Sequence, residues 1–168
     1  MLGFIGVMCN CKTIIRYLIV ENKKVRNARG HIYGGISFKS GLEVTAYKEL
    51  MKEGFNPEYE KHTYILQKSK LFPTQHYAPF KDRKLHKEVW GLNKYKIISL
   101  KYTPDFVFTI GDKLVVIEIK GYSNDRYPYQ KKLFFKYLED HYPNSAFFEI
   151  HNQKQLKAAI DIIKKFTE

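Results

Sequence analysis

Two acidic residues occupy matching positions on the two halves of a predicted β-hairpin. In the stretch YTPDFVFTIGDKLVVIEIKGY, two runs rich in β-branched and aromatic residues flank Gly111-Asp112, a dipeptide that favours a tight turn. With these two residues as the turn, Asp105 lies opposite Glu118, with Cβ atoms about 5 Å apart. Two carboxylates at that distance repel each other unless a divalent cation lies between them, and hard oxygen ligands suit magnesium or manganese. The spacing therefore predicts a metal site on this hairpin.

A lysine belongs to the same predicted group. Lys120 is expected on the same face of the strand as Glu118, because side chains alternate along a strand and the residue between them turns to the core. Charged residues at the end of an otherwise apolar strand are more typical of a site than of a surface strand. A plainer interpretation stays open, in which Glu118 and Lys120 form an ordinary ion pair and Asp105 only ends a strand after Pro104.

A third carboxylate lies near the start of a helix predicted over residues 41–53. Ser40 is a favoured N-cap, Glu43 three residues later completes a capping box, and Gly54 is a favoured stop. In that role Glu43 only stabilises the helix. Its alternative role is to supply a carboxylate to a metal ion or to an attacking water, and helical geometry alone favours capping.

The other predicted elements complete an α/β fold. We expect strands over residues 57–66 and 146–150, a helix over residues 127–141 and a last helix capped by Asn152. From residue 40 onward the order is helix, three strands, helix, strand and helix. That order implies a mixed central β-sheet with helices packed on it.

Two stretches lie outside that order. Residues 1–39 are expected to form an N-terminal strand, over Thr13–Val20, followed by a basic arm, and residues 40–168 form the main domain. Within this domain, residues 67–100 are predicted to be a long loop with a short helix around residues 82–90. A loop of that length is unusual in a compact domain, so we expect it to have a function or to contain structure of its own.

The charge of the chain indicates a polyanionic partner. Its 168 residues include 29 lysines and arginines against 17 acidic residues, which gives a net charge of +12. On a folded domain such an excess points most often to nucleic acid. Solvated surface charge is the alternative for each of the basic residues that we expect to contact phosphates: Lys23, Lys24, Arg26, Arg29, Lys131 and Lys132.

Cysteine usage predicts a reducing, cytoplasmic environment, and the N-terminal sequence predicts no membrane span. Cys9 and Cys11 are separated by one residue, a poor spacing for a disulfide, and no second cysteine pair completes a zinc site. Lys12 and Arg16 interrupt the apolar run at the start of the chain, so no membrane span is expected.

These motifs resemble the PD-(D/E)XK nuclease superfamily, and within it the phage endonuclease I family of four-way DNA junction (Holliday junction) resolvases. The similar segments are FKSGLEVTAYKELMKEGFNPEYE, KYTPDFVF and the strand that ends in EIKGY, within residues 37–60 and 101–140. The resemblance implies a restriction-endonuclease-like core, of order α-β-β-β-α-β. It also implies metal-dependent hydrolysis of phosphodiester bonds at four-way or other branched DNA junctions.

The resemblance assigns roles to individual residues. It implies a catalytic set of Glu43, Asp105, Glu118 and Lys120. Asp105, Glu118 and the backbone carbonyl of Ile119 would hold a first Mg²⁺ or Mn²⁺. Glu43 would bind a second ion or orient the water, which gives two ions per site. Glu58 aligns with an accessory acidic residue of the family.

The resemblance also implies a homodimer, because the family makes paired cuts. In the family, the segment that corresponds to residues 67–100 is much shorter and joins two swapped halves of the dimer, so domain swapping stays open here. Other functions stay open as well. They are a nuclease of the same core that acts on duplex, mismatched or nicked DNA, a non-catalytic basic DNA-binding protein, and a basic structural or RNA-binding protein.

Overall fold

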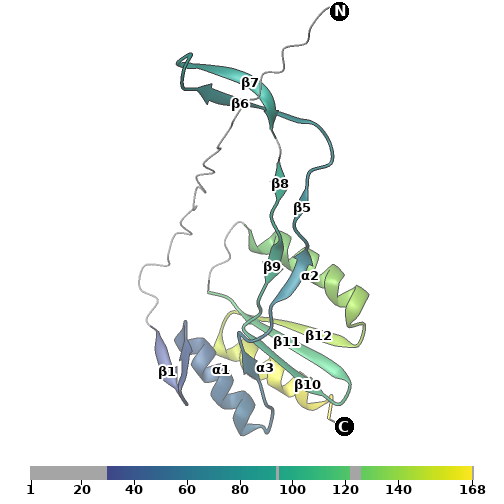
Figure 1. Ribbon diagram of the computed structural model, residues 1–168. Helices are drawn as coiled ribbons and strands as arrows, with labels where there is room; N and C mark the ends of the chain where they lie inside the picture. The colour runs from purple at the N-terminus through teal and green to yellow at the C-terminus, as the bar shows by residue number, and fades with distance from the viewer. Residues whose placement is uncertain (1–29, 94, 122–125, 168) are drawn as a thin grey trace, which may run out of the picture.

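A four-stranded mixed sheet lies at the centre of the computed structural model, which describes residues 30–93, 95–121 and 126–167 (Figure 1). Its strands are, in spatial order, β12 (Ser145–Ile150), β11 (Lys113–Ile119), β10 (Phe106–Ile110) and β3 (Glu58–Tyr59). Strand β10 is antiparallel to both of its neighbours, and β12 is parallel to β11. The predicted α/β class with a mixed sheet is confirmed.

Helices cover both faces of this sheet. The described residues contain α1 (Gly41–Lys52), α2 (Tyr127–His141) and α3 (Gln153–Lys164), at the predicted positions. Helices α1 and α3 pack on the face that carries Val115 and Ile117, and α2 packs on the face that carries Val116. Strand β11 is apolar on both faces because both are buried.

The central hairpin has the predicted register. Gly111 has a φ of 58° in the turn, a conformation that glycine adopts without strain, and Ile110 pairs with Lys113. The pairing continues without a bulge to Phe106 and Ile117. The next position outward therefore brings Asp105 beside Glu118.

The strand predicted over residues 57–66 is wrong as a single element. The structure divides it into β3, in the central sheet, and β4 (Tyr64–Gln67), in a separate sheet. The chain turns at Glu60, which has a φ of 48° and donates its backbone N–H to the carbonyl of Asp105 at 2.9 Å.

The loop with a short helix predicted for residues 67–100 is also wrong. The chain from residue 64 to 102 forms a two-stranded antiparallel ribbon, which we call the arm, and Figure 1 shows it projecting from the core. Its paired strands are β4 with β9 (Leu100–Tyr102), β5 (Lys70–Leu71) with β8 (Lys96–Ile97), and β6 (His76–Asp82) with β7 (Lys87–Asn93).

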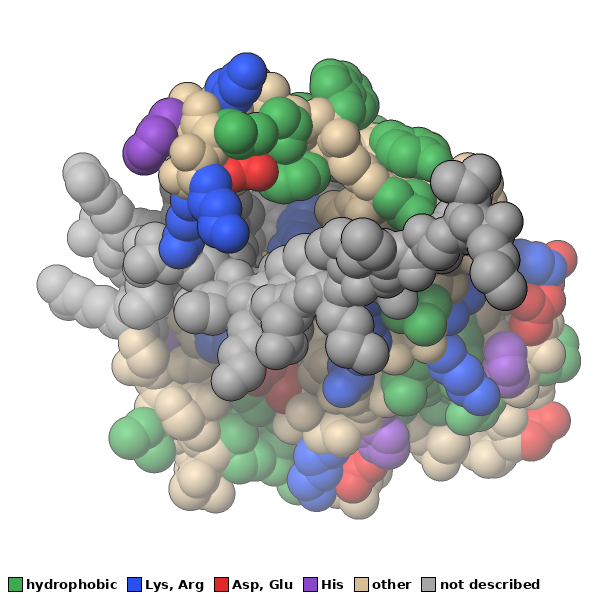
Figure 2. Space-filling view, turned by 45° about the horizontal axis from the view of Figure 1, so that its top comes forward, with side chains coloured by type: hydrophobic (Ala, Val, Ile, Leu, Met, Phe, Trp, Pro, Cys, Tyr) green, Lys and Arg blue, Asp and Glu red, His purple; other side chains and the backbone are tan. Residues whose placement is uncertain are grey.

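A tight turn stands where the short helix was expected. Asp82 accepts hydrogen bonds through Oδ1 from the backbone N–H groups of Lys84 and Leu85, at 2.8 and 3.1 Å, and His86 has a φ of 48°. These bonds fix the reversal between β6 and β7. Figure 2 shows hydrophobic side chains, together with lysine or arginine, on the surface along the top of the view, where the arm lies.

A short hairpin precedes α1 within the basic segment predicted before residue 40. It consists of β1 (His31–Tyr33) and β2 (Ile36–Phe38), and Phe38 is fully buried in the core beside α1. The strand predicted over Thr13–Val20 lies outside the described residues. In the described parts of the chain, no helix has the length and apolar character needed to cross a membrane.

Candidate active site

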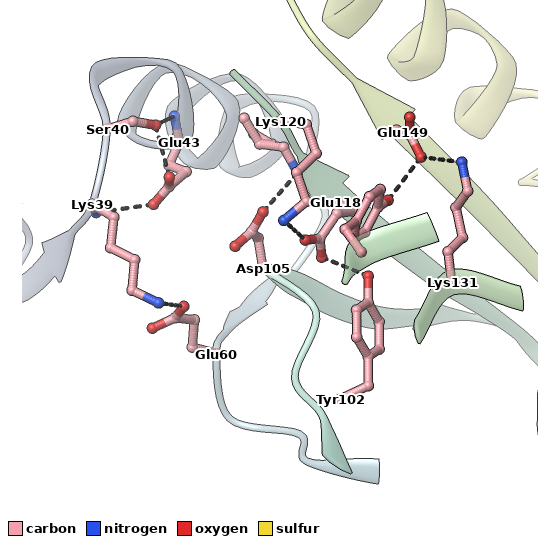
Figure 3. A network of polar contacts seen from close by, with 12 residues as sticks. Lys39, Ser40, Glu43, Glu60, Tyr102, Asp105, Glu118, Lys120, Lys131 and Glu149 are labelled. Carbon is pink, nitrogen blue, oxygen red and sulfur yellow. Dashed lines mark hydrogen bonds and ion pairs between the residues drawn. The ribbon is translucent and has the colours of Figure 1, made fainter. Parts of the chain in front are cut away.

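Three of the four predicted catalytic residues are buried acids. In the described part of the chain, buried charged side chains are confined to Glu43, Asp105 and Glu118. They come from the first turn of α1, from the residue before β10 and from the end of β11 (Figure 3). Buried charges are costly unless they are paired or hydrogen-bonded, so each of these carboxylates needs partners within the protein.

Asp105 and Glu118 are neighbours across the hairpin, as predicted. Asp105 accepts a hydrogen bond through Oδ2 from the backbone N–H of Ile119 at 2.6 Å, and Glu118 accepts one through Oε2 from the hydroxyl of Tyr102 at 2.8 Å. Burial, reinforced by the charge of Glu118, raises the pKa of Asp105 to about 8. The Ile119 N–H and Lys120 act in the opposite direction but do not outweigh burial.

Lys120 lies on the predicted face of the strand. Its ammonium forms an ion pair with Glu118 Oε1, and it also lies 4.5 Å from the centre of the Tyr127 ring. The side chain of Lys120 is about one quarter exposed (25%), whereas that of its partner Glu118 is buried. The structure thus brings Asp105, Glu118 and Lys120 together.

Glu43 fulfils its predicted capping role. Ser40 Oγ accepts from the Glu43 N–H at 3.2 Å and donates to Glu43 Oε1 at 2.7 Å. The other carboxylate oxygen accepts from the Lys39 N–H at 2.9 Å and from the Tyr59 hydroxyl at 2.6 Å. Burial, together with the hydrogen bond to Glu43, raises the pKa of Tyr59, so this hydroxyl remains a donor.

An ion pair that the sequence analysis missed lies beside these acids. Lys39 binds Glu60, which is held in place by its backbone bond to Asp105 (Figure 3). Burial alone would lower the pKa of Lys39, but Glu60 raises it, and the charges of Asp105 and Glu43 add to the rise. No motif spacing indicated this contact, because it depends on the turn at Glu60.

A second polar network lies beside Lys120. Glu149 pairs with Glu118 in the β11–β12 register and accepts from the Tyr127 hydroxyl and from Lys131 Nζ, each at 2.7 Å. His151 Nε2 lies 3.1 Å from Glu149 Oε1, and its Nδ1 lies 3.0 Å from the Lys120 carbonyl oxygen. The network anchors the backbone that carries Lys120.

The residues predicted to contact DNA lie in different environments. Lys131 is engaged with Glu149 and is 30% exposed, whereas Lys132 is exposed on α2. Lys23, Lys24, Arg26 and Arg29 lie outside the described residues.

The structure does not bring Glu58 together with the other acids. Its carboxylate pairs with His62 and Lys61, which lower its pKa, and it lines a separate cavity of about 320 Å³ with Tyr64 and Tyr142. Glu58 pairs with Val107 in β10, whereas the adjacent Tyr59 reaches Glu43. Because side chains alternate along a strand, Glu58 turns away from Glu43.

The donor chemistry fits a divalent cation at one pair of carboxylates. Among the described residues, no group of three or more histidine, cysteine, aspartate or glutamate side chains is arranged to hold a metal ion. Asp105 and Glu118 nevertheless supply adjacent hard oxygen donors, and two buried carboxylates gain from a cation. Glu43 is engaged by its capping bonds, so a second ion would need Glu43 to leave them.

Comparison of the chain with protein-family models, with curated proteins and with solved structures found no match.

Proposed function

We propose that the protein is a metal-dependent endonuclease that hydrolyses phosphodiester bonds at four-way or other branched DNA junctions. The observation that carries this proposal is the pair of buried carboxylates, Asp105 and Glu118, with the Lys120 ammonium on the second of them. The net charge of +12 and the resemblance to the endonuclease I family support a DNA substrate. Symmetric cleavage of a junction needs two sites, so we expect a homodimer.

Asp105, Glu118 and the backbone carbonyl of Ile119 would hold a Mg²⁺ or Mn²⁺ ion. The bound ion supplies Lewis-acid stabilisation of negative charge on the phosphate. Asp105 binds it only as a carboxylate, so the proton that its raised pKa retains must leave first. The Tyr102 hydroxyl fixes Glu118 Oε2 toward the site.

Lys120 supplies positive charge where it is needed. Its ammonium, held between Glu118 and the Tyr127 ring, would donate to the attacking oxygen and stabilise the negative charge that develops on the phosphate. Water would attack phosphorus and lose a proton, the bond from phosphorus to the 3′ oxygen would break, and that oxygen would take up one proton, so that the net reaction moves a proton from water to the leaving oxygen. The products are a 5′-phosphate and a 3′-hydroxyl, as the resemblance implies.

Glu43 has a conditional place in this scheme. It would orient the attacking water or bind a second ion after it exchanges its bonds from Tyr59 and the Lys39 N–H for the new partner. A non-catalytic DNA-binding protein is the second candidate function. The capping bonds that keep Glu43 from joining the other two acids favour it.

Incubation with labelled DNA tests the proposal. The wild-type protein should cut a four-way junction symmetrically with Mg²⁺ or Mn²⁺ and should be inactive in EDTA, while a matched linear duplex is cut far less. Asp105→Asn should bind the junction without cutting it. Asp112→Asn makes the same chemical change in the exposed turn of the same hairpin and should cut normally. Junction binding without cleavage, even with Mn²⁺, would favour the second candidate.

A further inference from the structure

The arm concentrates the positive charge of the molecule. Residues 64–102 contain nine lysines and arginines against two acidic residues, Asp82 and Glu88, and so carry +7 of the net charge of +12. None of the described basic residues of the arm forms an ion pair with another described residue. Seven lysines outside the arm do form such pairs. The charge of the arm is therefore available to a partner.

One face of the outer part of the arm, the ribbon formed by β6 and β7, is apolar and uncovered. Tyr77 pairs with Leu92 and Pro79 pairs with Trp90, and opposite residues of an antiparallel pair share a face. The side chains of Tyr77, Trp90 and Leu92 are 55%, 73% and 57% exposed. A two-stranded ribbon with such a face is only marginally stable in water, so a partner that covers it is expected.

The other face of the ribbon is covered only in part, by the Phe80 ring, which remains 52% exposed. The Phe80 ring lies across Gly91, where a Cβ atom would collide with it. Phe80 pairs directly with Val89, which is half-buried. Glycine at position 91 thus lets one aromatic ring lie on this face of the ribbon, whereas the face with Trp90 carries three exposed apolar side chains.

The charge beside this face favours nucleic acid over protein. Lys81 follows Pro79 on the face with Trp90, and Arg83, Lys84 and Lys87 surround the turn. Lysine is depleted in the cores of protein interfaces, whereas sites for single-stranded nucleic acid combine basic side chains with aromatic rings on which bases stack. Figure 2 shows lysine or arginine beside the hydrophobic side chains of this region.

The base of the arm adjoins the candidate active site. Strand β9 ends at Tyr102, whose hydroxyl binds Glu118, and the next hydroxyl, Thr103 Oγ1, lies 2.8 Å from Thr63 Oγ1 across the ribbon. Asp105 follows two residues later. A DNA strand bound along the arm would therefore be directed to the buried carboxylates.

We infer that the face of the arm formed by Tyr77, Trp90 and Leu92 binds unpaired nucleotides of a DNA strand beside a branch point. Bases stack on the rings of Trp90 and Tyr77, and the lysines and arginine around the turn contact the phosphates. This inference rests on the proposed function, since it names the part of the branched DNA that the arm holds.

The fluorescence of Trp90 tests the inference directly, because the chain contains one tryptophan. Full-length Asp105→Asn protein is titrated with a single-stranded oligonucleotide, with a branched DNA that carries unpaired nucleotides, and with a matched duplex. Saturable quenching is expected with the first two and not with the duplex. In fluorescence anisotropy of the labelled DNA, Trp90→Ala should weaken binding by about 5- to 150-fold, the effect of losing one stacked base.

A matched control variant is Tyr129→Ala, which removes an aromatic ring that is 71% exposed on α2, outside the arm. Equal affinity of the Trp90→Ala and Tyr129→Ala proteins overturns the inference. A Trp90 signal that responds to protein concentration and not to DNA also overturns it, since a second copy then covers the face. Quenching by DNA in a protein that cuts no DNA refutes the proposed nuclease and leaves the inference standing. Cleavage of DNA without quenching of Trp90 supports the proposed nuclease and overturns the inference.

Discussion

Asp105 combines a strong hydrogen bond with an unfavourable electrostatic environment. The Ile119 N–H holds its carboxylate at 2.6 Å, yet burial and the charge of Glu118 keep its pKa at about 8. A residue that served only to end a strand would gain nothing from this position. A carboxylate that a cation must deprotonate would have these properties.

The stability of the protein should depend on pH and metal through Asp105. The folded state retains a proton on Asp105 that the unfolded state loses near pH 3.8, so without metal the free energy of unfolding should fall as pH rises from about 4 to about 8. A divalent ion competes with that proton. The increase in the midpoint of thermal unfolding on addition of Mn²⁺ should therefore be small at about pH 6 and larger above about pH 8.

Circular dichroism at a series of pH values measures both effects. Asp105→Asn should abolish the Mn²⁺ response and flatten this part of the pH profile, whereas Asp112→Asn, in the exposed turn, should leave both unchanged. A Mn²⁺ response that persists in Asp105→Asn would place the ion elsewhere.

Tyr102 should matter for stability as well as for cleavage. Burial and the charge of Glu118 raise the pKa of Tyr102, so its hydroxyl remains a donor to Glu118 Oε2. Tyr102→Phe leaves that buried oxygen without this donor and should lower the free energy of unfolding by about 1.5–3 kcal/mol. Chemical denaturation measures the loss, and Tyr129→Phe, on an exposed ring, should cost almost nothing. An unchanged free energy of unfolding in Tyr102→Phe would show that water replaces the hydroxyl as the donor to Glu118.

Among the elements, α1 connects helix capping to the candidate active site. The same Glu43 carboxylate completes the capping box with Ser40 and binds Tyr59 from β3. The first turn of the helix is thereby fixed against the strand that leads to Glu60 and, through its backbone, to Asp105. Capping and the proposed catalytic role make different demands on Glu43, and substitution can separate them.

Two substitutions distinguish these roles. Ser40→Ala removes the cap and should lower the free energy of unfolding by about 1 kcal/mol while cleavage persists. Glu43→Gln keeps groups that can donate and accept in the cap but removes the charge, so it should abolish cleavage at a smaller cost in stability. Denaturation and junction cleavage are measured on both proteins. Cleavage that falls only in proportion to stability in both would leave Glu43 with a capping role alone.

The elements that the sequence predicted correctly depend on local signals. Helix α1 follows its capping box, α3 follows Asn152, and the register of the central hairpin follows from Gly111 in its turn. That register was enough to bring Asp105 and Glu118 together. Local signals of this kind act over a few residues and do not need the rest of the fold.

The arm could not be predicted in the same way. Pro79 lies within β6, where a proline is unfavourable in most strands, but a two-stranded ribbon has open edges on both sides, where a residue without an N–H is tolerated. Within the site, Tyr102 and the Lys39–Glu60 pair were missed because they depend on tertiary placement. The positive φ of Glu60, in particular, has no signal in the residues around it.

At the scale of the whole molecule, lysines of the core and lysines of the arm differ in their ion pairing. Seven of the described lysines outside the arm form ion pairs, among them Lys120 with Glu118, Lys131 with Glu149 and Lys164 with Glu53. Those of the arm are not paired with described residues, and the apolar side chains beside them remain exposed. This difference accords with the proposal that the arm binds DNA and the core cleaves it.

The core should therefore fold without most of the arm. Among the described residues of the arm, only Tyr64, Leu66 and Tyr102 reach either apolar cluster of the core. Replacing residues 68–99 with Asn-Gly joins the paired Gln67 and Leu100 through a two-residue turn. The free energy of unfolding should change by about 1 kcal/mol or less, since no core side chain is lost.

DNA binding should report the loss of the arm even though the core remains folded. The slope of the logarithm of the DNA-binding constant against the logarithm of the salt concentration is negative. Each phosphate contact that is removed makes it less steep by about 0.7 to 0.9, so the shortened protein should show a distinctly weaker salt dependence. Circular dichroism gives the stability, and fluorescence anisotropy at several salt concentrations gives the slope. An unchanged slope would place the phosphate contacts on the core, and an unfolded product would make the arm part of the folding unit rather than a substrate-binding extension of it.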